Sequence, residues 1–82
     1  MKLEELKKSV FVVGIKETAR AIEKGEAVHV FVAADADDRV ALPLKEACAD
    51  KKVPITTDVS KADLGKACGI KVKAAAAAVL SR

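Results

Sequence analysis

The sequence predicts an α/β domain, a three-layer α-β-α sandwich with a four-stranded sheet, and two observations lead to this prediction. Helical and strand-like patterns alternate along the chain, which is typical of a sheet covered by helices on both faces. The 82 residues are 51% hydrophobic and 33% charged, a globular balance in a chain of a length that builds one core. We therefore expect a single domain over residues 1–82. Its core must be packed from small side chains, since Phe11 and Phe31 are its only aromatic residues.

The first half of the chain contains two predicted helices and two predicted strands. Residues 3–10 have apolar side chains at helical spacing, and the continuous apolar run 10–13 then predicts a buried strand that ends at Gly14. A second helix is expected over residues 15–24 with Gly25 as its stop, and residues 28–32 predict the second strand. The side chains expected to face the core from these two helices are Leu3, Leu6, Val10, Ile15, Ala19 and Ile22.

The second half begins with a helix that Asp35 or Asp37 caps and that runs to about Lys51. Pro43 predicts either a late start or a break in this helix. Residues 53–57 predict a short strand, which Pro54 places at an end or an edge of the sheet. Ser60 then caps a helix to Ala67 in a capping-box arrangement with Asp63. The side chains expected to face inward from the longer helix are Val40, Leu44, Ala47 and Cys48.

The alanine run at residues 74–78 supports two interpretations. Alanine has the highest intrinsic helix propensity, which favours a helix. The segment has no polar face, however, and Val72, Val79 and Leu80 flank it. A wholly apolar segment suits the centre of a sheet that helices cover on both sides. The residues alone leave both interpretations open.

Charge and composition exclude several classes of protein. No apolar run reaches the length of about 18 residues that a membrane span needs. Residues 2–8 do not resemble a signal peptide, because their charges leave no apolar central region. We therefore expect a cytoplasmic protein that makes no membrane contact. Cys48 and Cys68 lack metal-ligand spacing, so we expect reduced, structural cysteines. The net charge is +1 over residues 1–29, −2 over residues 30–59 and +4 over residues 60–82. Positive charge at the C-terminal end is a modest indication of nucleic-acid binding.

A turn after the first predicted strand carries the first candidate site. Gly14 precedes a helix whose free amides attract anions. Lys16, Glu17 and Arg20 lie three and four residues apart, so they can share one exposed face of that helix. A carboxylate between cations can accept hydrogen bonds from the N1–H and N2–H₂ edge of guanine, while Lys or Arg donates to O6 and N7. The competing interpretation is an ordinary cluster of surface ion pairs.

A second candidate site lies between the last helix and the alanine run. Gly69 is expected at the left-handed position that ends a helix. Beyond Gly69, apolar and cationic residues alternate, so an extended loop can direct them to opposite sides. A loop that is both apolar and basic suits a polyanion with an exposed base. Together with Lys66, the residues of this candidate site are Ile70, Lys71, Val72 and Lys73.

These motifs resemble a known family. Gly-Ile-Lys-Glu-Thr after a strand, Lys-Gly at residues 24–25, Ala-Asp-Ala-Asp at residues 34–37, and above all Leu-Gly-Lys-Ala-Cys-Gly-Ile-Lys-Val at residues 64–72 are similar to the kink-turn RNA-binding ribosomal-protein family. The bacterial YbxF-type members are the most similar. The resemblance covers residues 12–80 in order and spacing, and the motif at residues 64–70 is its most specific part.

The resemblance implies a mixed α-β-α sandwich that grips a sharply bent RNA stem at tandem sheared G·A pairs. It implies that the turn after the first strand reads guanines in the widened major groove, which assigns this role to Lys16, Glu17 and Arg20, with Gly14 allowing close backbone approach. It further implies that Ile70, Lys71 and Val72 pack against an extruded nucleotide, and that the alanine run is a strand. The full set of RNA-binding residues expected is Gly14, Ile15, Lys16, Glu17, Arg20, Lys66, Ile70, Lys71, Val72 and Lys73.

The sequence departs from the family at two places. Position 15 is often Thr in relatives and can cap the helix, whereas Ile15 cannot, which leaves an amide free for phosphate or costs about 1 kcal/mol. Lys71 and Lys73 stand where relatives often have Glu and either Gly or Pro. These lysines add positive charge next to the RNA, so we expect tighter and more salt-sensitive binding.

Enzyme activity has little support in the sequence. Asp35, Asp37 and Asp38 lack the partner motif of a metal or phosphoryl-transfer site, and His29 lies in an apolar strand without a catalytic partner. We therefore expect no enzyme activity, no metal and no cofactor. The expected function is recognition of kink-turns in structured RNA, such as ribosomal or riboswitch RNA, by a monomer that is associated with the ribosome. The alternative is a protein-interaction or ribosome-assembly adaptor that keeps the fold without specific RNA binding.

Overall fold

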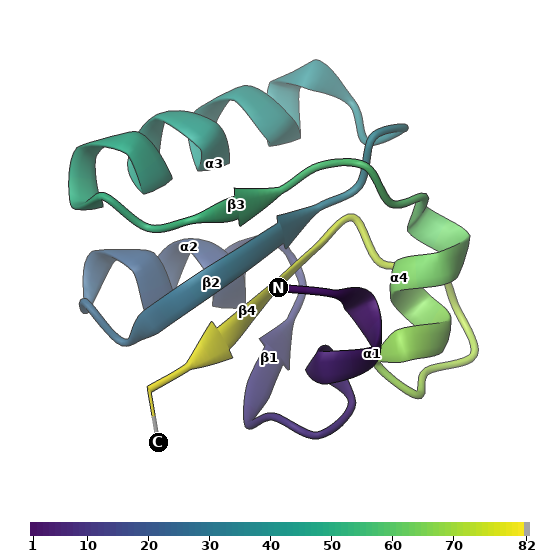
Figure 1. The fold of residues 1–82 in the computed structure, drawn as a ribbon. Coiled ribbons are helices and arrows are strands. Elements are labelled where there is room, and N and C mark those ends of the chain that lie inside the picture. Colours follow the sequence, from purple (N-terminus) through teal and green to yellow (C-terminus); the bar gives the residue numbers. More distant parts are fainter. Residues whose placement is uncertain (82) are drawn as a thin grey trace.

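The computed structural model describes residues 1–81 and has a four-stranded sheet between two layers of helices (Figure 1). The strands are β1 (Phe11–Val13), β2 (Ala27–Val32), β3 (Ile55–Thr56) and β4 (Ala76–Leu80), and the helices are α1 (Leu3–Leu6), α2 (Ile15–Glu23), α3 (Asp38–Lys51) and α4 (Lys61–Ala67). The strand order is β1-β4-β2-β3. β4 runs antiparallel to both of its neighbours and β2 runs parallel to β3, so the sheet is mixed, as expected. None of the helices within residues 1–81 is long and apolar enough to cross a bilayer.

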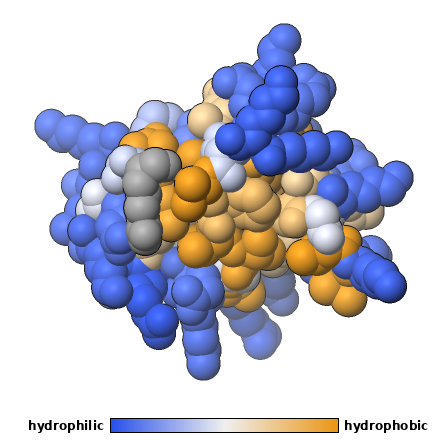
Figure 2. Space-filling view, turned by 90° about the horizontal axis from the view of Figure 1, so that it is seen from below, coloured by the Kyte–Doolittle hydropathy of each residue, from blue (hydrophilic) through white to orange (hydrophobic). Residues whose placement is uncertain are grey.

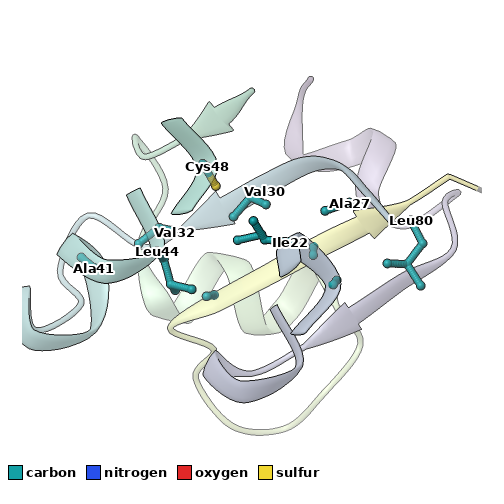
Figure 3. Packing of buried hydrophobic residues seen from close by; sticks show 11 residues of the cluster. Ile22, Ala27, Val30, Val32, Ala41, Leu44, Cys48 and Leu80 are labelled. Carbon is teal, nitrogen blue, oxygen red and sulfur yellow. The ribbon is translucent and has the colours of Figure 1, made fainter. Parts of the chain in front are cut away.

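Side chains alternate between the two faces of the sheet and build a separate core cluster on each face. On one face, Val30 and Val32 of β2 pack with Ile22 of α2 and with Leu44 and Cys48 of α3 (Figure 3). On the other face, Phe31 of β2 and Val79 of β4 pack with Leu6 of α1 and with Leu64 and Ala67 of α4. This two-sided burial is the three-layer sandwich predicted from the alternation of helix and strand.

The end of the alanine run lies in β4, one of the two interior strands of the sheet, which confirms one of the two interpretations open from the residues. Ala76, Ala77 and Ala78 are fully buried, and β4 pairs with β1 on one side and with β2 on the other. Alanine has high helix propensity, but burial on both faces and pairing along both edges outweigh a preference of less than about 1 kcal/mol per residue. Tertiary context therefore decides the structure of this segment.

Helix ends follow the predicted glycines. Gly25 and Gly69 both have positive φ, at 72° and 74°. After α4, the Gly69 amide donates to the Lys66 carbonyl and the Ile70 amide to the Gly65 carbonyl, which is the Schellman pattern. Helix α3 ends in the left-handed conformation without a glycine, because Lys52 adopts φ 58° there. The start of α4 also agrees with its prediction, since the Ser60 hydroxyl accepts a hydrogen bond from the Asp63 amide at 3.0 Å.

Several details of the predicted helices need correction. Helix α1 ends at Leu6, and Val10, which was expected to face the core from it, is 50% exposed. Ile15 is 42% exposed, and Thr18, Ala21 and Ile22 form the buried face of α2 instead. The N-cap of α2 is Gly14, and Ile15 is the first residue of the helix. The expectation that position 15 is the capping position was therefore wrong by one residue. Helix α3 begins after Asp37, one of the two predicted caps, so the late start is the alternative that holds, and the helix continues through Pro43 without a break. The ring lies in the second turn on an exposed surface, where the lost amide bond is tolerated.

His29 is the one buried histidine, and its environment favours the neutral form. Its Nε2 lies 2.7 Å from the Thr56 hydroxyl, and its ring is 5.0 Å from that of Phe31. Burial lowers the pKa of His29 below its usual value, the positive chain amino terminus lowers it further, and Glu5 opposes the shift. Protonation of the imidazole would therefore place a charge inside the sheet layer.

The free energy of unfolding should depend on the protonation of His29. Because its pKa is lower in the folded protein, its stabilising contribution is present above the unfolded pKa of about 6.5 and is lost as pH falls below it. We expect urea unfolding at about pH 7.5 and pH 5.5 to show lower stability at the acidic pH. The variant His29→Gln, which keeps a polar group near Thr56, should show a smaller difference between the two pH values. An equal difference in the variant would contradict this assignment.

Candidate nucleic-acid interface

Three loops meet at one end of the sheet. The Gly14 amide donates to the Ala76 carbonyl at 2.9 Å and thereby joins the β1–α2 turn to the start of β4. The Ala33 amide donates to the Ala75 carbonyl at 2.9 Å and joins the β2–α3 loop to the same segment. The Ala74 amide donates to the Lys61 carbonyl at 3.1 Å, which ties the α4–β4 loop to α4. We call this region the three-loop end; it brings the two candidate sites of the sequence onto one side of the molecule.

The β1–α2 turn presents free hydrogen-bond donors. Gly14 has φ 109° and ψ 160°, a conformation that strongly favours glycine, and no side chain caps the helix. The amides of Ile15, Lys16 and Glu17 have no acceptor among residues 1–81, and the first helical bond runs from the Thr18 amide to the Gly14 carbonyl. The positive end of the α2 dipole therefore faces solvent with three open donors.

The charged residues of α2 are exposed and weakly paired. The Arg20 guanidinium lies 3.3 Å from the Glu17 carboxylate, with side chains 59% and 51% exposed. A solvent-exposed pair of this kind contributes only about 0–1 kcal/mol, so both groups can exchange partners at low cost. Lys16 is exposed and makes no ion pair within the described part of the chain. Glu17 and Arg20 line a hollow of about 190 Å³ beside Val12 and Leu80.

The α4–β4 loop lies against its own helix because Gly65 has no side chain. A Cβ atom at Gly65 would overlap the carbonyl oxygen of Val72 and approach Cα of Lys73 at 3.3 Å. The loop runs back along α4 and forms with it a hollow of about 210 Å³. The residues that line this hollow are Ala62, Lys66, Ile70, Lys71, Val72 and Lys73. The structure thus brings Lys66 together with the loop residues predicted to act with it.

Apolar and basic side chains are exposed together at the three-loop end. Ile70 is 36% and Val72 69% exposed, and Lys71 and Lys73 stand between and beside them. Ile15 at the start of α2 adds a third exposed apolar side chain. Exposed apolar side chains without a packing role, set among cations, are typical of a surface that covers an unstacked base near phosphates.

The predicted residues divide into two sets that line different hollows. Glu17 and Arg20 belong to the hollow beside β1, whereas Lys66 and the loop residues 70–73 belong to the hollow on α4. The backbone hydrogen bond between Gly14 and Ala76 joins the turn that precedes the first set to the strand that follows the second. A ligand that contacts both sets therefore has to span the three-loop end, which fits an extended polymer better than a small molecule.

Sequence reasoning missed three residues of this region. Asp35 accepts a hydrogen bond from the Lys61 amide at 2.8 Å and so ties the β2–α3 loop to the start of α4. Of the two predicted caps of α3, only Asp37 caps the helix. Thr18 is fully buried under the turn, and its hydroxyl has no partner among the described residues. Gly65 was recognised only as part of a sequence motif, and its close contact with the backbone of Val72 was not predicted. No local pattern reveals these roles, because each depends on a contact with a distant segment or on burial.

Metal and thiol chemistry find no support here. No group of three or more His, Cys, Asp or Glu side chains within residues 1–81 could hold a metal ion. Both cysteines are free, as expected, and burial raises the pKa of the Cys48 and Cys68 thiols. Raised pKa values keep the thiols protonated and unreactive.

Comparison with known proteins identifies the family of this chain. Residues 2–82 match the model of the Ribosomal protein L7Ae/L30e/S12e/Gadd45 family. The chain belongs to this family. The chain is 46% identical over 69 residues to the RNA-binding protein YbxF of Geobacillus stearothermophilus, with 84% of each chain covered. An RNA-binding protein of Geobacillus sp. (strain WCH70) matches with the same identity and coverage.

A solved structure extends the match to the whole fold. The Giardia lamblia 15.5kD RNA binding protein superimposes with a TM-score of 0.88 at 32% identity, over 98% of this chain and 71% of that one. The resemblance inferred from the motifs is therefore confirmed, and so is the mixed sandwich that it implied. The relatives named here are described as RNA-binding proteins.

The close approach at Gly65 predicts a specific effect of Gly65→Ala. Alanine should favour the helix by about 1 kcal/mol, but its Cβ would displace the Val72 carbonyl and with it the loop. We expect faster hydrogen exchange by NMR at the Ile70 and Ala74 amides, which bond to α4. Lys66→Ala, at an exposed position of the same helix, is the control and should leave both amides protected. Unchanged exchange in Gly65→Ala would show that the loop does not depend on this contact.

Proposed function

We propose that this protein recognises and stabilises kink-turns in structured RNA through their tandem sheared G·A pairs. The observation that carries the proposal is the three-loop end, where an uncapped helix start lies beside a loop that is both apolar and basic. A kinked duplex offers such a surface two features at once, a widened groove with exposed guanine edges and an extruded nucleotide. The printed names of the relatives, which are RNA-binding proteins, support RNA as the ligand class.

The α2 side of the surface has the chemistry for reading guanine. Glu17 supplies an acceptor for the N1–H and N2–H₂ groups, while Lys16 and Arg20 supply donors for O6 and N7. The absence of a side chain at Gly14 opens space, since no described atom lies within 4 Å of an ideal Cβ there. The exposed Arg20–Glu17 pair fixes the carboxylate only weakly, so rearrangement on binding costs little.

The loop side of the surface has the chemistry for an unstacked nucleotide. Ile70 and Val72 can cover the face of a base, and Lys66, Lys71 and Lys73 can contact the flanking phosphates. We place this activity in the cytoplasm, with the protein acting as a monomer on ribosomal or riboswitch RNA. An adaptor without specific RNA binding is the alternative that the following experiment distinguishes.

Replacing Glu17 should remove the preference for G·A pairs. In a gel-shift titration at fixed salt, we expect the protein to bind a kink-turn RNA at least about tenfold more tightly than the same RNA with Watson–Crick pairs in place of the G·A pairs. Glu17→Ala loses the guanine acceptor and should reduce this ratio to near one. Glu46→Ala, at an exposed position on α3, is the matched control and should keep the ratio. Equal binding of both RNAs by the unmodified protein would favour the adaptor.

The two loop lysines should make binding sensitive to salt. The logarithm of the binding constant falls with the logarithm of salt concentration by roughly 0.7–0.9 per phosphate contacted. We expect the double variant Lys71→Glu, Lys73→Gly to bind more weakly at low salt and to show a slope shallower by about one or more. Lys45→Glu, exposed on α3, should leave the slope unchanged. Equal slopes for the double variant and the unmodified protein would exclude phosphate contacts by Lys71 and Lys73.

A further inference from the structure

A shallow hollow outside the three-loop end lies where α1, β1 and α4 come together. It has a volume of about 370 Å³. It lies between the end of α1, the first residue of β1 and the C-terminal end of α4. The residues that line it are Lys7, Phe11, Lys66, Ala67, Cys68 and Gly69. We call it the Lys7–Lys66 hollow. None of the functions assigned above uses Lys7 or Phe11.

The lining of this hollow combines two cations with an aromatic ring and small side chains. Lys7 and Lys66 are exposed, and neither makes an ion pair within residues 1–81. No carboxylate lines the hollow. Phe11 is partly buried: it packs against the core cluster of α1 and α4 and also lines the hollow. Cations beside an aromatic side chain are the elements with which proteins bind an unpaired nucleotide.

The hollow adjoins the proposed RNA surface through a shared residue. Lys66 lines both the Lys7–Lys66 hollow and the hollow formed by α4 with loop residues 70–73. A strand that leaves the loop along α4 therefore passes Lys66 and reaches Phe11 and Lys7. Figure 2 views the molecule from below relative to Figure 1. It shows apolar surface bordered by long hydrophilic side chains.

We propose that the Lys7–Lys66 hollow binds one unpaired nucleotide of the RNA strand adjacent to the kinked motif. Lys7 and Lys66 hold its phosphate, and its base stacks on Phe11. The chain has only two phenylalanines, and the fold places one of them in the lining of this hollow. The inference rests on the proposed function, because it takes RNA as the ligand and the three-loop end as its main site.

The test compares a blunt kink-turn RNA with one that carries a short single-stranded overhang containing 2-aminopurine. The protein has no Trp or Tyr, so the fluorescence of the probe base is read without protein background. We expect the overhang to raise affinity about fivefold or more and the fluorescence to be quenched by stacking. Lys7→Gln should remove most of the gain while leaving affinity for the blunt RNA unchanged.

Two further variants sharpen the experiment. Phe11→Leu keeps an apolar side chain in the core cluster and removes the ring face, so quenching should disappear. Lys45→Gln, exposed on α3, is the matched loss of one charge and should keep both the affinity gain and the quenching. If Phe11→Leu fails to fold, Lys7→Gln carries the test, because Lys7 is exposed.

The outcomes separate this inference from the proposed function. An overhang that changes neither affinity nor fluorescence overturns the inference, and so does a gain that persists in Lys7→Gln. If the hollow instead binds a protein partner, Lys7→Gln will not change the affinity for RNA. That result would also overturn the inference. The proposed function fails separately, if the blunt kink-turn RNA and its Watson–Crick control bind with equal affinity. In that case the overhang gain and its loss in Lys7→Gln can still be measured on either RNA.

Discussion

The pairing of β4 with both β1 and β2 is the interaction on which the rest of the structure depends. Without it, β1 has no neighbour in the sheet, and only the short β2–β3 pair remains between the two helix layers. The small side chains of Ala76, Ala77 and Ala78 are part of this constraint, because they are fully buried between the two layers. Larger side chains there would force the layers apart, since protein cores tolerate added volume poorly. The same pairing positions the candidate site, because the Gly14 amide bonds to the first residue of β4.

Local physical chemistry accounts for much of the fold. The glycines that end α2 and α4, the Ser60 cap and the nearly continuous apolar run of β2 follow directly from backbone preference and residue type. The alanine run could not be assigned in this way, because its conformation depends on burial by segments far away in the sequence. Ile15 was placed on the wrong face for a related reason. The buried face of α2 is set by how the helix docks on the sheet, and a short helix leaves the phase of its apolar pattern ambiguous.

The types of residue in the candidate site could be predicted from the sequence. Their arrangement in space could be predicted only in part. The turn at Gly14 and the loop at residues 70–73 carry composition that already suggests a polyanion. Their meeting at one end of the sheet depends on strand order, which the residues themselves did not determine. The supporting contacts of Asp35 with Lys61 and of Gly65 with Val72 join segments that no periodicity relates. Resemblance to a family supplied what local reasoning lacked, since it carried the strand assignment of the alanine run.

The hydrogen bond between Gly14 and Ala76 has a consequence for biosynthesis. It joins the turn before the second helix to the last strand, so the residues that flank it are far apart in the order of translation. A nascent chain that has emerged only through α4 lacks β4 and the turn that pairs with it. Nascent chains at this stage therefore expose open strand edges at β1 and β2. The three-loop end is complete only in molecules whose synthesis has passed β4.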